Sequence, residues 1–145
     1  MKTFIWFALA FLLFACTPKQ ESCKQVSSAE AEKVVKDYFI ALQERDFEKL
    51  HALSTKDYIL FDQGFIWNND SIINVFLKKP TLKINYELKD FNTQTDCNSA
   101  FVSYLNYGVI HLGDTSYNKN WTESAAVRRV DGEVKLAFLH STAMK

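Results

Sequence analysis

The sequence predicts an α+β domain in which helices fill the first half of the chain and an antiparallel sheet fills the second. Two changes of period support this prediction. Apolar residues recur every three or four positions after residue 27, as in a helix with one buried face, and every second position after Pro80, as in a strand with one exposed face. Because the helices precede the strands instead of alternating with them, we expect them to pack on one face of the sheet.

The first helix is predicted to begin at Ser27 and to run to about Glu44. Ser27 and Glu30 have the spacing of a capping box, in which the serine side chain caps the helix and the glutamate side chain reaches back. One face of this helix carries an apolar stripe, which we expect to be buried. The stripe consists of Ala31, Val34, Val35, Tyr38, Phe39, Ala41 and Leu42.

Two shorter helices and a small hairpin are predicted between the first helix and the main sheet. Asp46 is expected to cap the second helix, and Asn69 or Asp70 to cap a third over residues 71–78. The hairpin between them is predicted to have strands at residues 58–61 and 65–67, joined by the turn Asp62-Gln63-Gly64.

The main sheet is predicted from four apolar runs that are separated by polar or glycine-containing segments. Asp131-Gly132 is a strong signal for a tight hairpin between the last two runs. We expect polar turns at residues 92–99 and 113–120. The four antiparallel strands are then expected at residues 82–89, 100–112, 121–130 and 133–142.

The N-terminal segment is typical of an export signal. Lys2 precedes an apolar run over residues 4–15, which is shorter than the roughly 20 residues that a membrane-spanning helix needs. Leu13-Phe14-Ala15-Cys16 resembles the lipobox of bacterial lipoproteins, although Phe14 departs from it. The resemblance implies lipidation of Cys16 and a membrane anchor in the bacterial cell envelope, at the periplasmic or outer-membrane face. The alternative is ordinary secretion, with Cys16 incidental.

The remaining chain is divided by composition into a short polar tether at residues 16–27 and one domain at residues 28–145. Export permits a disulfide between Cys23 and Cys97, and two free thiols are the alternative. No metal-ligand spacing is present, and we expect no metal and no cofactor. The 17 basic and 17 acidic side chains form no basic patch along the sequence, which argues against nucleic acid as a partner.

The order of predicted elements resembles the nuclear transport factor 2-like superfamily, including its SnoaL-like and ketosteroid-isomerase-like branches. Three segments carry the resemblance, at residues 38–50, 57–64 and 128–141, and Val134 stands where the family often has tryptophan. The resemblance implies a cone, with a curved sheet wrapped around the helices and a pocket at the open end. It also implies a homodimer through the outer sheet face. The superfamily contains enzymes, ligand binders and protein-binding modules, so the fold alone does not define a function.

The same resemblance places Asp62 at the general base of the steroid-isomerase branch and Tyr38 at its oxyanion-holding tyrosine. A carboxylate base beside a phenol is suitable for proton transfer. The third partner of that branch, a protonated acid, aligns with Ala126, so such a site is incomplete here. The structural alternative is that Asp62 is a turn residue and that Tyr38 is a core residue.

Near the end of the last predicted strand, His140 shares its parity with Leu136 and Phe138. It is expected to face the pocket beside Glu123 or Trp121 of the neighbouring strand. A histidine–carboxylate pair suits acid–base chemistry or polar ligand binding, and a hydrogen-bonded structural histidine is the alternative. The direction of Glu123 remains open, because both faces of its strand are small or apolar. Candidate pocket-lining residues, with core packing as their alternative role, are Tyr58, Trp67, Tyr86, Tyr104 and Trp121.

Three functions follow from these observations. The first is a lipid-anchored, non-catalytic module that binds an unidentified small molecule or serves as an accessory protein. The second is an acid–base enzyme (isomerase, lyase or hydrolase) that uses Asp62, Tyr38 and His140. The third is a structural module that self-associates through its sheet face.

Overall fold

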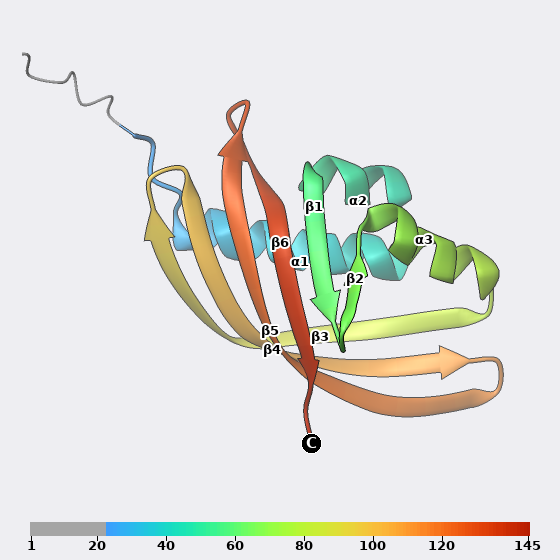
Figure 1. The fold of residues 1–145 in the computed structure, drawn as a ribbon. Helices are drawn as coiled ribbons and strands as arrows, with labels where there is room; N and C mark the ends of the chain where they lie inside the picture. The colour runs from blue at the N-terminus through green and yellow to red at the C-terminus, as the bar shows by residue number, and fades with distance from the viewer. Residues whose placement is uncertain (1–22) are drawn as a thin grey trace, which may run out of the picture.

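The computed structural model describes residues 23–145, which form three helices and one curved sheet (Figure 1). The six strands have the order β2-β1-β6-β5-β4-β3, and α1 lies along the concave face of the sheet. In chain order the elements are α1 (Ser28–Glu44), α2 (Phe47–Leu53), β1 (Ser54–Asp62), β2 (Phe65–Trp67), α3 (Asn69–Lys78), β3 (Leu82–Asp96), β4 (Ser99–Leu112), β5 (Thr115–Val130) and β6 (Glu133–Ala143).

The helix starts follow the predicted capping chemistry, with one correction. Ser27 and Glu30 form a reciprocal capping box on α1, and the Asp46 side chain accepts from the Lys49 N–H at the start of α2. The cap of α3 is Asn68 instead of Asn69 or Asp70, because its side-chain oxygen accepts from the Ser71 N–H at 2.9 Å.

The prediction of two long polar turns in the main sheet is wrong, because β3 continues to Asp96 and β5 already begins at Thr115. The connections that remain, Cys97-Asn98 and Gly113-Asp114, are only two residues long. The residues added to β5 are mainly exposed, and those added to β3 alternate between exposed and half-buried positions that are filled mostly by polar side chains. Apolar periodicity therefore gives little strand signal there.

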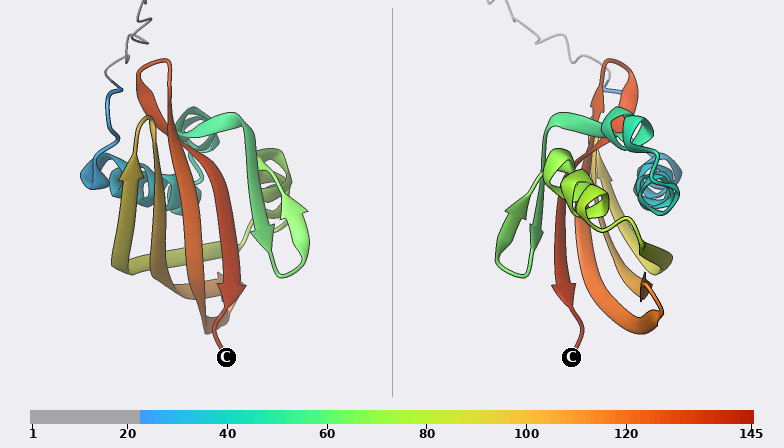
Figure 2. Two further views of the ribbon diagram at one scale, coloured as in Figure 1. Left: turned by 60° about the vertical axis from the view of Figure 1, so that its left-hand side comes forward. Right: turned by 90° about the vertical axis from the view of Figure 1, so that its right-hand side faces the viewer.

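The sheet is mixed instead of wholly antiparallel, since β1 pairs in parallel with β6 and antiparallel with β2. This pairing attaches the small hairpin to the edge of the main sheet. The right-hand view of Figure 2 looks at the end of the molecule where this hairpin, α3 and the β4–β5 hairpin meet the concave face. The sheet does not close, so the concave face is open at this end.

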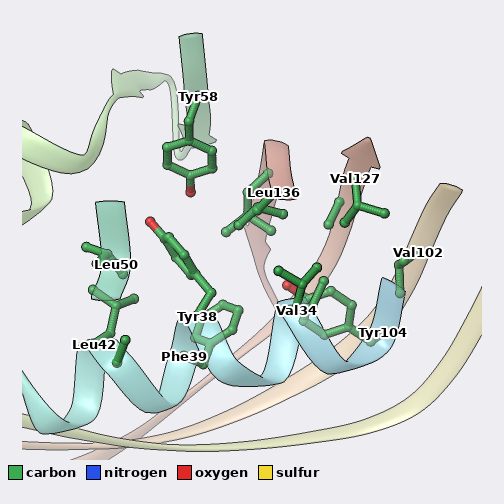
Figure 3. Close-up of a cluster of buried hydrophobic side chains, with 14 of the residues drawn as sticks. Val34, Tyr38, Phe39, Leu42, Leu50, Tyr58, Val102, Tyr104, Val127 and Leu136 are labelled. Carbon is green, nitrogen blue, oxygen red and sulfur yellow. The ribbon is translucent and has the colours of Figure 1, made fainter. Parts of the chain in front are cut away.

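The core lies between α1 and the concave face of the sheet (Figure 3). Tyr38 and Val35 of α1 are fully buried there, as are Val102 of β4 and Leu136 of β6. The apolar stripe predicted for the first helix is buried along its whole length, because α1 packs against the sheet on one side and α2 on another.

The last part of the predicted tether belongs to the folded domain. Cys23 and Cys97 form a disulfide that joins the N-terminal segment to the β3–β4 turn. Gln25 pairs with Cys97 through an isolated β-bridge, and Val26 is fully buried in the core. The signal segment and Cys16 lie outside the described residues. Within residues 23–145, no helix has the length and apolar character needed to cross a membrane.

Candidate functional site

A pocket of about 240 Å³ opens between α1, α3 and the concave face of the sheet. Its walls are mainly apolar and come from elements that are far apart in the sequence. Three of the predicted aromatic residues, Trp67, Tyr86 and Trp121, line it. Tyr58 and Tyr104 do not, because they lie deeper in the core, where Figure 3 shows them around α1.

Gly108 permits Trp121 to lie flat against the sheet. A Cβ atom at Gly108 would overlap the six-membered ring of Trp121, which comes from the neighbouring strand. The ring centroids of Trp121 and Tyr86 are 6.4 Å apart, so the two side chains form one aromatic wall. The glycine is therefore a requirement of the pocket wall.

Glu123 is the polar centre of the pocket. Its side chain points to the concave face between the buried residues Trp121 and Ala125, which settles the direction that the sequence left open. The carboxylate accepts hydrogen bonds from Ser141 Oγ at 2.8 Å and from Asn106 Nδ2 at 3.2 Å. Burial raises the pKa of Glu123 to about 7 despite these hydrogen bonds, and the charge of Asp62 adds to the increase. A carboxyl group of this kind exchanges its proton near neutral pH.

Asp62 and Lys119 add two further charged groups to the pocket lining. Asp62 is the last residue of β1 and is half-buried, and its one hydrogen-bond donor among residues 23–145 is Gln63 Nε2, at 3.4 Å. The Lys119 ammonium lies over Trp121, 5.4 Å from the ring centroid. The pocket therefore contains two carboxyl groups and one ammonium group.

The phenol of Tyr38 is committed to a structural hydrogen-bond chain, although its ring lines the pocket. Tyr38 donates to Asn69 Oδ1 at 3.0 Å, Asn69 Nδ2 donates to Ser54 Oγ at 2.6 Å, and Ser54 donates to the Leu50 carbonyl at 2.9 Å. Burial raises the pKa of Tyr38 above its ordinary value. The phenolic proton is thus directed at Asn69 Oδ1, and it is not free to form a hydrogen bond with a ligand.

His140 does not face the pocket, contrary to the prediction. Leu136 pairs with Val127, but Phe138 pairs with Ala126, so Ala137 is an extra residue that forms a β-bulge. Since each one-residue slip exchanges the two faces of a strand, the bulge turns His140 outward, 6.5 Å from the ring centroid of Phe61. Ala126 lies on the same outer face, so the residue that aligns with the third acid does not line the pocket.

Sequence reasoning missed three polar residues of the pocket, Asn106, Lys119 and Ser141. A signal was present for Asn106, which shares the inward parity of Tyr104 and Ile110 in an otherwise apolar strand. Its Oδ1 atom has no hydrogen-bond partner. Among residues 23–145, no group of three or more histidine, cysteine, aspartate or glutamate side chains is arranged to hold a metal ion.

A six-stranded mixed sheet curved around α1, with an acid-containing pocket at its open end, is the nuclear transport factor 2-like fold. A nuclear transport factor 2-like protein from Cytophaga hutchinsonii superposes with a TM-score of 0.71 at 15% identity, over 82% of this chain and 100% of that chain. A ketosteroid isomerase-like protein from Erwinia carotovora atroseptica superposes with a TM-score of 0.65 at 21% identity, over 81% and 95%. The β subunit of benzoate 1,2-dioxygenase from Burkholderia mallei superposes with a TM-score of 0.71 at 9% identity, over 83% and 93%.

Neither a family model nor a curated protein matches the sequence. The likeness therefore establishes the fold, and the function depends on the chemistry of the pocket.

Proposed function

We propose that the domain is a non-catalytic module that binds a small, largely apolar molecule in the pocket. The observation that carries this proposal is the placement of one buried carboxyl group, Glu123, within walls that are otherwise mainly apolar. Pockets that bind small molecules typically combine apolar walls with a few convergent polar groups that fix orientation. Tyr38, Asp62 and His140 do not converge into a catalytic arrangement, because His140 is outside and the Tyr38 proton is committed.

Native mass spectrometry of residues 17–145, purified gently from the host cell, tests this function. We expect a co-purifying small molecule on the parent protein. The mass should be absent from Ile84→Phe, which adds bulk to the pocket wall, and retained in the matched control Leu105→Phe on the outer face. A clean ligand-free mass for the parent, or equal retention by both variants, would contradict binding in the pocket.

We further propose that Cys16 carries the lipid that holds this module in the bacterial cell envelope. The support is the lipobox-like segment Leu13-Phe14-Ala15-Cys16 after a short apolar run. More than one acyl chain is needed for stable anchoring, and lipoprotein modification supplies this number. Labelled palmitate should be incorporated into the parent and not into Cys16→Ser, and absence of label from the parent would refute the anchor.

Acid–base catalysis is a second candidate, which one observation favours. Glu123 and Asp62 line one pocket in different environments, and such pairs commonly divide the roles of acid and base. An isomerase, lyase or hydrolase of this kind would exchange a proton with its substrate. Hydrogen–deuterium exchange at the α-carbon of added cyclic ketones, followed by NMR, should then be faster with the parent than with Glu123→Gln. Equal rates would exclude this function for these substrates.

Self-association through the outer sheet face is a third candidate. Phe61 and Phe101 on this face are 40% and 46% exposed, and Phe61 packs against Phe138 at a centroid distance of 5.3 Å. Sedimentation of residues 17–145 should show a dimer that Phe101→Lys dissociates. A monomeric parent at high protein concentration would rule the homodimer out.

A further inference from the structure

We propose that the ligand of the pocket is an organic ammonium, an amine that carries an apolar or aromatic group. This inference rests on the proposed binding function and names the chemical class of the ligand. Three features of the pocket lead to it: a half-buried carboxylate that protein donors leave largely free, an excess of carboxyl groups over cations, and walls that are rich in aromatic rings.

The pocket lining contains acceptors with few or no partners, and also two such donors, the buried Trp67 Nε1–H and the Lys119 ammonium. Within residues 23–145, Asp62 accepts from one protein donor, at 3.4 Å, and Asn106 is fully buried with an Oδ1 atom that has no partner. The amide orientation of Asn106 is set by its Nδ2 atom, which donates to Glu123, so Oδ1 must accept. Because Asn106 Oδ1 has almost no accessible surface, the acceptor that a ligand with N–H donors can reach is the half-buried Asp62 carboxylate.

The charges in the pocket favour a cation. Asp62 and Glu123 are its carboxyl groups, and Lys119 is its one ammonium group among the described residues. Lys119 makes no ion pair within residues 23–145, because its ammonium lies over Trp121. With both carboxyl groups ionised, the pocket carries one uncompensated negative charge. A bound cation would compensate this charge, whereas a bound carboxylate would add to it.

The aromatic wall provides the other half of the recognition. Cations are attracted to the faces of tryptophan and tyrosine rings, and cages of such rings bind quaternary ammonium and methyl-lysine groups. The Lys119 ammonium already lies over the Trp121 ring, so a ligand cation would compete with it there. Phe39 and Tyr86 extend the wall, with ring centroids 4.8 Å apart. The apolar remainder of the ligand would pack against the α3 residues Ile72 and Phe76, which line the same pocket.

A set of probes that differ mainly in charge tests the inference. Calorimetric titrations of residues 17–145 would compare phenethylamine (cation), phenethyl alcohol (neutral) and hydrocinnamate (anion) at about pH 8, where Glu123 is mostly ionised. We expect phenethylamine to bind at least about tenfold more tightly than the alcohol, and hydrocinnamate to bind most weakly. Asp62→Asn and Glu123→Gln should each reduce this preference several-fold. Glu87→Gln, on the outer face, is the matched control and should keep it.

The outcomes separate the ligand class from the binding function. If the alcohol or hydrocinnamate binds as tightly as phenethylamine, the ammonium inference is wrong and small-molecule binding stands. If the preference for phenethylamine persists unchanged in both carboxyl variants, the carboxyl groups do not recognise the cation and the inference is also wrong. If no probe binds and the parent carries no co-purifying molecule, both the inference and the binding function fail.

Discussion

The Ser141 hydroxyl donates a hydrogen bond to Glu123 across the β5–β6 pair, at 2.8 Å between Oγ and Oε1. Both residues are buried, and the β-bulge at Ala137 is what turns Ser141 inward to meet the carboxylate. This contact stabilises the ionised form of a group whose burial favours the neutral form. The protonation of Glu123 therefore depends on the balance between burial and a small number of donors.

Ser141→Ala should raise the pKa of Glu123 above 7, because a donor to the charged form is lost while burial remains. The loss of the hydrogen bond should also lower the free energy of unfolding by about 1 kcal/mol. NMR titration of the carbon-labelled carboxyl group measures the pKa directly. Thr142→Ala, one residue further on and facing outward, is the control and should leave the pKa unchanged. A lowered or unchanged pKa in Ser141→Ala would contradict this account.

Glu123 should also make the stability of the protein depend on pH. Burial raises its folded-state pKa to about 7 from 4.5. Between these values the folded chain keeps the proton while the unfolded chain loses it, so a rise in pH favours unfolding over this window. Glutamine does not titrate. The stability of Glu123→Gln relative to the parent should therefore improve by on the order of 3 kcal/mol between about pH 4.5 and about pH 7.

Denaturant titrations of the parent and Glu123→Gln at a series of pH values measure this difference. Glu87→Gln on the exposed outer face is the control, and we expect no comparable improvement over the same window. A constant difference between the parent and Glu123→Gln would mean that the folded-state pKa of Glu123 is not raised.

The parts of the fold that local chemistry determines could be predicted from the sequence. The capping box at Ser27 and the hairpin at Asp131-Gly132 are examples, since each depends on a few adjacent residues. Pairings between distant segments could not be predicted, because the parallel contact of β1 with β6 has no local signal. The bulge at Ala137 caused the largest error in the predicted site. This single extra residue reverses the facing of the strand after it, so that Ser141 lines the pocket in place of His140.

Arg45 should stabilise the contact between the end of α1 and the pocket wall. Its Nη2 atom donates to the carbonyls of Lys79 and Pro80 at 3.3 and 3.0 Å and also contacts the Leu82 carbonyl. The guanidinium lies 5.5 Å from the ring centroid of Phe76, which lines the pocket. Arg45→Ala removes these contacts and should lower the free energy of unfolding by about 1–3 kcal/mol, as measured by chemical denaturation.

Arg45→Gly is the informative comparison, because Arg45 has a φ of 57°, in the left-handed region that glycine adopts without strain. We expect Arg45→Gly to be more stable than Arg45→Ala and less stable than the parent. If Arg45→Ala is as stable as the parent, the guanidinium contacts contribute nothing, because both residues carry a Cβ atom in the same left-handed conformation.

The disulfide should contribute substantially to stability, since Cys23 and Cys97 are 74 residues apart in the chain. Closing a long loop restricts the unfolded chain, and removal of such a bond typically costs about 2–5 kcal/mol. Cys97→Ser should therefore have a lower melting temperature than the parent. Reductant should lower the melting temperature of the parent and leave that of Cys97→Ser unchanged. If reductant also lowered the melting temperature of Cys97→Ser, its effect on the parent could not be attributed to the disulfide.

Gly108→Ala should displace Trp121, because the added Cβ atom would occupy the space of the indole ring. We expect a loss of about 1–3 kcal/mol in the free energy of unfolding, the range found for overpacked sites, and a shift in tryptophan fluorescence. In a Trp121→Leu background the same Gly108→Ala change should cost less, since leucine does not extend over the backbone of the neighbouring strand. The difference between the two costs separates the contact with the ring from the contact with the Lys119 carbonyl, which remains in both backgrounds. If Gly108→Ala costs as much in Trp121→Leu as in the parent, the carbonyl contact accounts for the loss, and Gly108 is needed for strand geometry instead of for the aromatic wall.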